Sequence, residues 1–219
     1  MKAILFDLDG TLANTDPLHF ATWQDVLKDY RLDIDRAFYD ANFSGRLNVD
    51  IIRDILPHLS LEEGRQLGDR KEAEFRCRAA TQLSPLPGLL NLLDWTDANK
   101  MQRAIVTNAP PDNAWFMLDT LRLRSTFPVV VIAEELPFGK PHPLPYQVGL
   151  EKLGVAPEEA LVFEDSPSGI RSAVGAGITT IGVASTHSSE DLYAAGATWV
   201  IRDFTEIQTF SSLVEKSYG

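Results

Sequence analysis

The chain has 219 residues, of which 44% are hydrophobic and 23% charged, and its formal net charge is −11 at pH 7. No cluster of Lys or Arg stands out and no stretch approaches the ~20 apolar residues of a membrane span, which argues against a nucleic-acid-binding or membrane-spanning protein. Cys77 is the only cysteine, so no disulfide can form within the chain; with an apolar strand beginning directly after Lys2 in place of a secretory signal, this favours a cytoplasmic protein.

The first predicted strand, Ala3–Asp7, is an apolar run that ends in two nearby carboxylates, Asp7 and Asp9. Residues two apart on a strand point to the same side, and Gly10 permits a sharp turn, so we expect both carboxylates to leave the sheet together. Like charges this close are unfavourable unless a cation or a shared proton compensates them. The pair therefore indicates a divalent-metal site, or two carboxyl groups with separate tasks. A solvated acidic turn is the alternative.

A helical block follows the first strand, because residues 17–83 carry helical patterns and no strand pattern. The segments with these patterns are His19–Tyr30, Val49–Leu56 and Leu61–Arg78. A crossover between two strands seldom needs so many residues. We therefore predict an inserted helical domain at 17–83 that acts as a lid on a core domain of residues 1–16 and 84–219. In the alternative, these helices pack on the sheet as ordinary crossovers.

Short apolar runs alternate with helical patterns in the remainder of the chain. The further predicted strands are Arg103–Thr107, Val129–Ile132, Ala160–Glu164, Thr179–Val183 and Thr198–Ile201. The helical patterns between the later strands are Pro111–Leu123, Pro143–Leu153 and Ser168–Ala176. Strands that are apolar on both faces are typical of a buried parallel sheet. The pattern predicts an α/β fold with a Rossmann-like, doubly wound parallel sheet.

Polar side chains follow each of the first four predicted strands. In chain order they are Asp7 and Asp9; Thr107 and Asn108; Glu134, Glu135 and Lys140; and Glu164 and Asp165. Ligands of open parallel sheets bind beyond the carboxyl ends of the strands, so we expect these groups to meet at one rim. Taken singly, each group has an ordinary alternative, such as a strand-end turn, a solvated lysine or a helix N-cap. Four such groups after four strands favour a functional site.

Each of these groups suits phosphoryl transfer. Asp7 and Asp165 supply the oxygen ligands that Mg²⁺ prefers. Thr107 can hold a phosphate, and Lys140 can offset the charge of the phosphate and of the nucleophile. An aspartate can accept a phosphoryl group as an acyl phosphate, and Asp9 is well placed to protonate the departing alkoxide and later to activate water.

Four motifs occur in a recognisable order along the chain. They are Asp7-Leu8-Asp9-Gly10-Thr11-Leu12, Thr107-Asn108, Gly139-Lys140-Pro141-His142-Pro143 and Phe163-Glu164-Asp165-Ser166. Together they resemble the four motifs of the haloacid dehalogenase superfamily. The helical insertion after the first motif resembles the α-helical cap of the β-phosphoglucomutase and phosphoglycolate phosphatase-like branch. The resemblance implies a Mg²⁺-dependent enzyme with a Rossmann-like core and a helical cap.

The resemblance also implies a role for each matched residue. Asp7 is expected to be the nucleophile and a Mg²⁺ ligand, and Asp9 the general acid and base, with its carbonyl on Mg²⁺. Thr107 and Lys140 are expected to bind phosphate with Asn108 assisting, Asp165 to bind Mg²⁺, and Glu164 to bind it or to order its waters.

In the cap, Phe43–Asn48 resembles the specificity loop of many sugar-phosphate phosphatases, with Gly45 and Arg46 at the matching places. As an alternative, Arg46 is a solvent-exposed loop arginine. We expect the hinges between the two domains near Asn14–Asp16 and Ser84–Gly88. His19 either contacts the reacting group or braces the hinge. A mutase of the β-phosphoglucomutase type would carry a basic residue about where Asn48 stands, which weakens the mutase interpretation.

We therefore predict a phosphatase that hydrolyses a small phosphorylated metabolite (a sugar, polyol or glycolate phosphate) through an aspartyl phosphate. We expect a monomer or weak dimer with no nucleic-acid or membrane partner. Asp9 argues against the haloacid dehalogenases proper, which are similar in fold but attack carbon. Phosphonatases need a cap lysine that the sequence does not identify. The alternatives are a β-phosphoglucomutase-type mutase and a phosphate-binding or signalling module without turnover.

Overall fold

The computed structural model describes residues 1–43 and 46–206. The chain divides into two units. The first combines Met1–Asn14 with the segment that begins at Ser84, and the second is Thr15–Leu83. The second unit thus interrupts the first soon after its opening strand.

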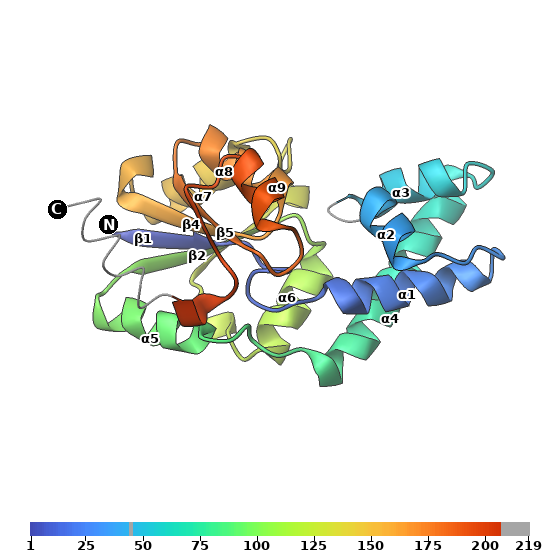
Figure 1. Ribbon diagram of the computed structural model, residues 1–219, viewed down its shortest axis with the longest axis horizontal. Helices are drawn as coiled ribbons and strands as arrows, with labels where there is room; N and C mark the ends of the chain where they lie inside the picture. Colours follow the sequence, from blue (N-terminus) through green and yellow to red (C-terminus); the bar gives the residue numbers. More distant parts are fainter. Residues whose placement is uncertain (44–45, 207–219) are drawn as a thin grey trace. The chain divides into compact units, whose positions relative to one another are not determined.

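The first unit contains a six-stranded sheet in the order β3-β2-β1-β4-β5-β6 (Figure 1). The strands are β1 Ala3–Phe6, β2 Gln102–Thr107, β3 Val129–Ile132, β4 Ala160–Glu164, β5 Thr179–Val183 and β6 Trp199–Ile201. Every neighbouring pair is parallel. The predicted doubly wound α/β fold is therefore confirmed. The strand order reverses between β1 and β4, which is where open sheets of this kind bind their ligands.

Helices cover both faces of this sheet. They are α5 Leu89–Ala98, α6 Pro111–Thr120, α7 Leu144–Leu153, α8 Pro167–Gly175 and α9 Ser189–Ala194. Figure 1 shows α7 and α8 on one side of the strands and α5 and α6 on the other. Both faces of the central strands are consequently buried, as the continuous apolar runs in the sequence predict.

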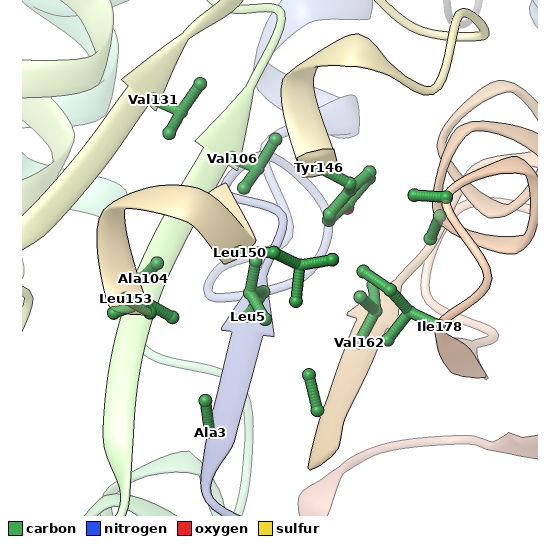
Figure 2. Packing of buried hydrophobic residues seen from close by; sticks show 13 residues of the cluster. Ala3, Leu5, Ala104, Val106, Val131, Tyr146, Leu150, Leu153, Val162 and Ile178 are labelled. Atoms are coloured by element: carbon green, nitrogen blue, oxygen red, sulfur yellow. The ribbon is translucent and has the colours of Figure 1, made fainter. Parts of the chain in front are cut away.

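The two faces of β1 have different cores. On one face, Leu5 joins a cluster that includes Val106, Val162 and, from α7, Tyr146 and Leu150 (Figure 2). The other face is aromatic. Phe6 stacks on Phe163, with ring centroids 5.4 Å apart, and meets Phe127 edge-on at 5.6 Å. Each large apolar side chain buried in this way stabilises the fold by about 1.5–3 kcal/mol. This packing makes the ends of β1 and β4 a rigid base for the polar residues that follow.

The second unit contains helices and no strand among its described residues, 15–43 and 46–83. Its helices are α1 Asp16–Lys28, α2 Arg36–Asn42, α3 Asn48–Ile55 and α4 Leu61–Gln82. Trp23, Leu27 and Phe43 belong to its own hydrophobic core. Ser60 starts α4 with a capping box, in which its hydroxyl accepts from the Glu63 N–H while the Glu63 carboxylate accepts from the Ser60 N–H at 2.8 Å. The unit thus has a hydrophobic core separate from that of the sheet.

Three helices lie outside the helical patterns that we identify in the sequence. Two of them, α2 and α9, have seven and six residues, which is too short to display a helical period. The third, α5, begins directly after Gly88, in a segment whose Pro and Gly residues indicate a hinge. Among the residues that the structure describes, no helix has the length and apolar character needed to cross a membrane.

Candidate active site

The polar residues after β1, β2 and β4 emerge at the same edge of the sheet. Phe6 pairs with Ile105 of β2 and with Phe163 of β4, so the three strands end almost level. The Asp7 N–H continues this pairing by donating to the carbonyl of Phe163 at 3.0 Å. The structure therefore brings the strand-end groups of three separate chain segments together.

Lys140 lies at the centre of this edge. Its Nζ donates to Oδ1 of Asp7 at 2.6 Å, to Oε1 of Glu164 at 2.5 Å and to the carbonyl of Val106 at 2.7 Å. An ammonium has three protons, so these contacts account for all of its donors and hold it in place. Burial would lower the pKa of Lys140, but the carboxylates of Asp7 and Glu164 outweigh this and raise it. Lys140 is therefore a permanent positive charge.

Asn108 holds the loop that carries Lys140. Its Oδ1 accepts from the Lys140 N–H at 3.0 Å, and its Nδ2 donates to the Lys140 carbonyl at 3.2 Å. A Cβ on Gly139 would lie only 3.1 Å from this Oδ1, so a glycine suits the close approach. Thr107 is buried, and its hydroxyl accepts from the Ala109 N–H at 2.9 Å. Direct phosphate binding by Thr107 and Asn108 stays a prediction, whereas the structure gives Asn108 a task in positioning Lys140.

Three buried carboxyl groups converge beside the ammonium. Asp7, Glu164 and Asp165 each offer one oxygen, and these oxygens lie within 4.8 Å of one another. Burial raises the pKa of Asp7 to about 7, with Glu164 also raising it and Lys140 opposing the rise. Burial, with Asp7 and Glu164, likewise raises the pKa of Asp165. When all three are ionised, three carboxylates and one ammonium leave two negative charges in excess. A divalent cation with a preference for oxygen ligands fits this group in charge and in chemistry.

Glu164 is held by four donors. Lys140 and the Tyr146 hydroxyl, at 3.1 Å, donate to Oε1, and the N–H and hydroxyl of Ser166, both at 3.1 Å, donate to Oε2. A Cβ on Gly169 would lie 1.6 Å from Oε1, so the carboxylate occupies the space that a glycine leaves open in α8. Tyr146 is a site residue that the sequence analysis missed, because its place in a helical pattern marks it only as a core residue.

Asp9 lies beyond the end of the strand. Because β1 ends at Phe6, the alternation of side chains along a strand does not extend to Asp9. Its backbone forms a bridge with Ala13, and Gly10 turns the chain at a φ of +76°. The charge of Asp9 contributes, after burial and Glu164, to raising the pKa of Asp7. The catalytic task of Asp9 stays a prediction.

The loop after β5 also reaches this edge, and the sequence analysis did not include it. The Thr186 hydroxyl donates to the carboxylate of Asp165, and His187 lies beside both residues. Thr11 Oγ1 donates to the other carboxylate oxygen, Oδ1 of Asp165, at 3.3 Å. The sequence signal was available, since Ser185, Thr186 and His187 follow a predicted strand, Thr179–Val183, after a single residue.

The predicted cap residues belong to the second unit. Gly45 lies outside the described residues. The guanidinium of Arg46 forms an ion pair with Asp54 and donates to the carbonyl of Asn42 at 3.0 Å, so it is anchored within its own unit. His19 stacks on Phe75, with ring centroids 4.0 Å apart, and its Nδ1 lies 2.8 Å from Nζ of Lys71.

Lys71 is the buried cation that the sequence analysis did not identify in this unit. Its Nζ forms an ion pair with Glu72 at 2.8 Å, and its side chain is 3% exposed. Asn48 Nδ2 donates to the same Glu72 oxygen at 2.5 Å. A hydrogen bond between Asn48 and the buried Glu72 therefore joins α3 to α4. The sequence pattern does not distinguish Lys71 from a lysine on the solvent-exposed face of a helix.

Comparison with known proteins identifies the family. A family model described as haloacid dehalogenase-like hydrolase matches residues 4–183. The chain is 32% identical over 211 residues to a validoxylamine A 7′-phosphate phosphatase of Streptomyces hygroscopicus subsp. limoneus, covering 94% of this chain and 96% of the relative. It is 31% identical over 211 residues to a phosphorylated carbohydrates phosphatase of Thermotoga maritima, covering 92% and 94% of the two chains.

A solved structure gives the same result. A haloacid dehalogenase hydrolase of family IA, variant 3, from Entamoeba histolytica superimposes with a TM-score of 0.86 at 30% identity, covering 94% of this chain and 95% of that chain. The similarity in sequence and in fold therefore extends over nearly the whole length of this chain and of each of these relatives. The superfamily that the four motifs predict is confirmed, and this chain belongs to the haloacid dehalogenase-like hydrolases.

Proposed function

We propose that this protein is a Mg²⁺-dependent phosphatase that hydrolyses a small phosphorylated sugar or polyol through an aspartyl phosphate on Asp7. The observation that carries the proposal is the ammonium of Lys140, which donates to Asp7 and to Glu164 while the Asp165 carboxylate completes the buried group. The names of the two curated relatives support a phosphatase that acts on phosphorylated carbohydrates and related compounds.

Asp7 is assigned as the nucleophile. Lys140 engages its Oδ1, so we assign the attack to Oδ2. The new O–P bond forms as the ester O–P bond breaks, and Asp9 gives its proton to the departing alkoxide. A water molecule then attacks the phosphorus of the acyl phosphate, Asp9 takes a proton from it, and inorganic phosphate and the Asp7 carboxylate are released.

Positive charge must meet the phosphoryl group at this edge, because the buried carboxylates would otherwise repel a phosphate dianion. Lys140 supplies one permanent charge, and Thr107 and Asn108 are assigned as further donors to the phosphate. Asp7, Asp165, Glu164 and the carbonyl of Asp9 are the groups that would hold Mg²⁺. When bound, the cation would stabilise negative charge on the phosphoryl oxygens.

The helical unit is assigned as a cap that closes over the substrate and excludes bulk water. In this assignment Gly45 and Arg46 recognise the part of the substrate that is not phosphate, and His19 contacts the reacting group or braces the hinge. Arg46 would have to exchange its ion pair with Asp54 for the substrate, so an Asp54→Asn variant should alter KM more than kcat.

We further propose a cytoplasmic location. Its support is chemical, since the only cysteine, Cys77, is an exposed free thiol, which a reducing compartment keeps reduced. The monomeric or weakly dimeric state stays a prediction that size-exclusion chromatography with light scattering would test.

The decisive experiment is a phosphate-release assay over a panel of sugar, polyol and glycolate phosphates, with Mg²⁺ and with EDTA. We expect turnover only with the cation, and loss of turnover in Asp7→Asn but not in the matched surface variant Asp119→Asn. Protein quenched in acid during turnover of a ³²P-labelled substrate should carry the label, and Asp7→Asn should not. Conversion of β-glucose 1-phosphate to glucose 6-phosphate without phosphate release would instead establish a mutase, and a stable phosphoprotein without release a binding module.

A further inference from the structure

The loop after β5 makes a set of contacts with Asp165 that the proposed mechanism does not use. Thr186 Oγ1 donates to Oδ2 of Asp165 and lies 3.3 Å from the Asp165 carbonyl oxygen. Nδ1 of His187 lies 2.9 Å from Thr186 Oγ1 and 3.1 Å from the same carbonyl. Two consecutive side chains of this loop are thus directed at a single residue of the buried acidic group.

The direction of the protons in this cluster follows from the chemistry of its members. A carbonyl oxygen can only accept, so the contact between His187 and the Asp165 carbonyl requires a proton on Nδ1. The same N–H also donates to Thr186 Oγ1, so the hydroxyl oxygen of Thr186 accepts a hydrogen bond from His187. The hydroxyl has a single proton of its own, so it donates one hydrogen bond, and it donates that bond to the carboxylate of Asp165. His187 therefore sets the direction in which Thr186 donates.

The turn after β1 also contacts Asp165 and lies against the loop after β5. A Cβ on Gly10 would lie 2.1 Å from Oδ2 of Asp165 and 2.9 Å from Cγ2 of Thr186. Gly10, Asp165 and Thr186 are therefore packed too closely for a side chain at position 10. Ser185 Oγ donates to the Gly10 carbonyl, and Thr11 Oγ1 donates to Oδ1 of Asp165 at 3.3 Å. The carboxylate is consequently held between two loops, with a hydroxyl on each oxygen.

We propose that Thr186 is a positioning residue for the cation site, and that His187 acts through it by directing its proton to Asp165. Each carboxylate oxygen has a lone pair left after accepting one hydrogen bond, so Asp165 can still bind a cation. A hydroxyl donor stabilises the carboxylate as an anion, turns it toward the oxygens of Asp7 and Glu164, and keeps it there before the cation arrives. This inference rests on the proposed function, since it assigns Asp165 as a cation ligand.

The test is the affinity of EDTA-stripped protein for Mg²⁺, measured by titration calorimetry without substrate. Thr186→Val removes the hydroxyl at nearly constant volume and should weaken Mg²⁺ binding by roughly 10- to 100-fold. Thr186→Ser keeps the hydroxyl and should restore affinity close to that of the wild type. His187→Leu should weaken Mg²⁺ binding less than Thr186→Val, because the Thr186 hydroxyl remains but His187 no longer fixes the direction in which it donates.

Thr180→Val is the matched control. Thr180 is a fully buried threonine of β5 whose hydroxyl donates to the Ile178 carbonyl at 2.9 Å, away from Asp165. Thr180→Val should lower the free energy of unfolding without changing the affinity for Mg²⁺. Wild-type affinity in Thr186→Val, or equal losses in Thr186→Val and Thr186→Ser, would overturn the inference.

Asp165→Asn separates this inference from the proposed function. If Asp165→Asn loses Mg²⁺ affinity and Thr186→Val does not, the cation site stands and only the positioning role fails. If the wild-type protein itself binds no Mg²⁺, the proposed cofactor is wrong and the inference falls with it.

Discussion

Nζ of Lys140 lies 2.6 Å from Oδ1 of Asp7, although 133 positions separate the two residues in the chain. The same ammonium donates to Glu164, so one cation stands between two buried carboxylates. Its position depends on Asn108, which directly follows β2 and binds the backbone of Lys140. Stability and proposed function therefore depend on the same charge.

Replacing Lys140 should test this dependence. Lys140→Met leaves the carboxyl groups of Asp7 and Glu164 buried without their cation, and breaking a buried ion pair in this way costs about 3–5 kcal/mol. We expect the free energy of unfolding, measured in urea, to fall by that amount and phosphatase activity to be lost. Lys152→Met, at an exposed site of α7, should change neither. A Lys140→Met protein as stable as the wild type would contradict the compensating role of the ammonium.

A divalent cation should stabilise the folded protein, because the carboxylates of Asp7, Glu164 and Asp165 are gathered only in the folded state. Mg²⁺ at about 100 times its dissociation constant should add about 2.7 kcal/mol to the free energy of unfolding. The measurement is thermal unfolding of EDTA-treated protein with increasing MgCl₂. Sodium chloride at matched ionic strength controls for screening, and Asp165→Asn should lose most of the effect. Equal stabilisation by the two salts would exclude a specific site.

Glu72 should make the helical unit sensitive to acid. Burial alone would raise the pKa of Glu72, but the adjacent Lys71 ammonium, with His19 and Asn48, lowers it from 4.5 to about 2. Because the folded-state pKa is depressed, the carboxylate stabilises the fold fully above pH 4.5, and this contribution is lost as the pH falls toward 2. Glu72→Gln should therefore lower the free energy of unfolding by roughly 3 kcal/mol at neutral pH, and by progressively less below pH 4.5.

Urea denaturation of the wild type and Glu72→Gln between pH 2.5 and 7 would measure this difference. Glu151→Gln, at an exposed position, is the control and should follow the wild type at every pH. A Glu72→Gln penalty that is constant across this range would show that the carboxylate charge is not what stabilises the unit.

Two glycines of α8 offer a matched pair of substitutions. A Cβ at Gly169 would lie 1.6 Å from Oε1 of Glu164, so Gly169→Ala must displace that carboxylate. The atoms nearest to a Cβ at Gly175 belong to the Pro143 ring, at 3.5 Å or more, which is an ordinary contact. We expect Gly169→Ala to lower activity and Mg²⁺ affinity by at least roughly 10-fold, and Gly175→Ala to change neither. Activity assays and calorimetry on the two variants would decide, and similar behaviour of both would contradict the need for a glycine beside Glu164.

The strands of the sheet could be predicted closely because their signal is local. Val129–Ile132, Ala160–Glu164 and Thr179–Val183 have the bounds that their apolar runs indicate, since strands buried on both faces admit few polar residues. Short helices gave no such signal. Six residues of α9 contain fewer than two turns, and their helical state depends on the Ser188 cap and on packing against β5 and β6.

The strand-end residues themselves could also be named from the sequence, because a parallel sheet with right-handed crossovers places the carboxyl ends of its strands at one edge. Their individual contacts could not. Tyr146 and Thr186 donate to Glu164 and Asp165 from α7 and from the loop after β5, and both look in the sequence like ordinary core or loop residues. Such contacts depend on how helices pack across a sheet, which involves side chains far apart in the chain.

The amino-acid order thus carries the alternation of strands and helices, the interruption of the sheet by a helical segment, and the identity of the groups at the ends of β1, β2 and β4, because each of these depends on neighbours within a few residues. Folding in three dimensions settles which charges compensate one another. Lys140 faces Asp7 and Glu164, which lie 133 and 24 positions away from it in the chain. A charge in the interior is stable only beside its partner, and that partner is chosen by packing rather than by distance along the chain.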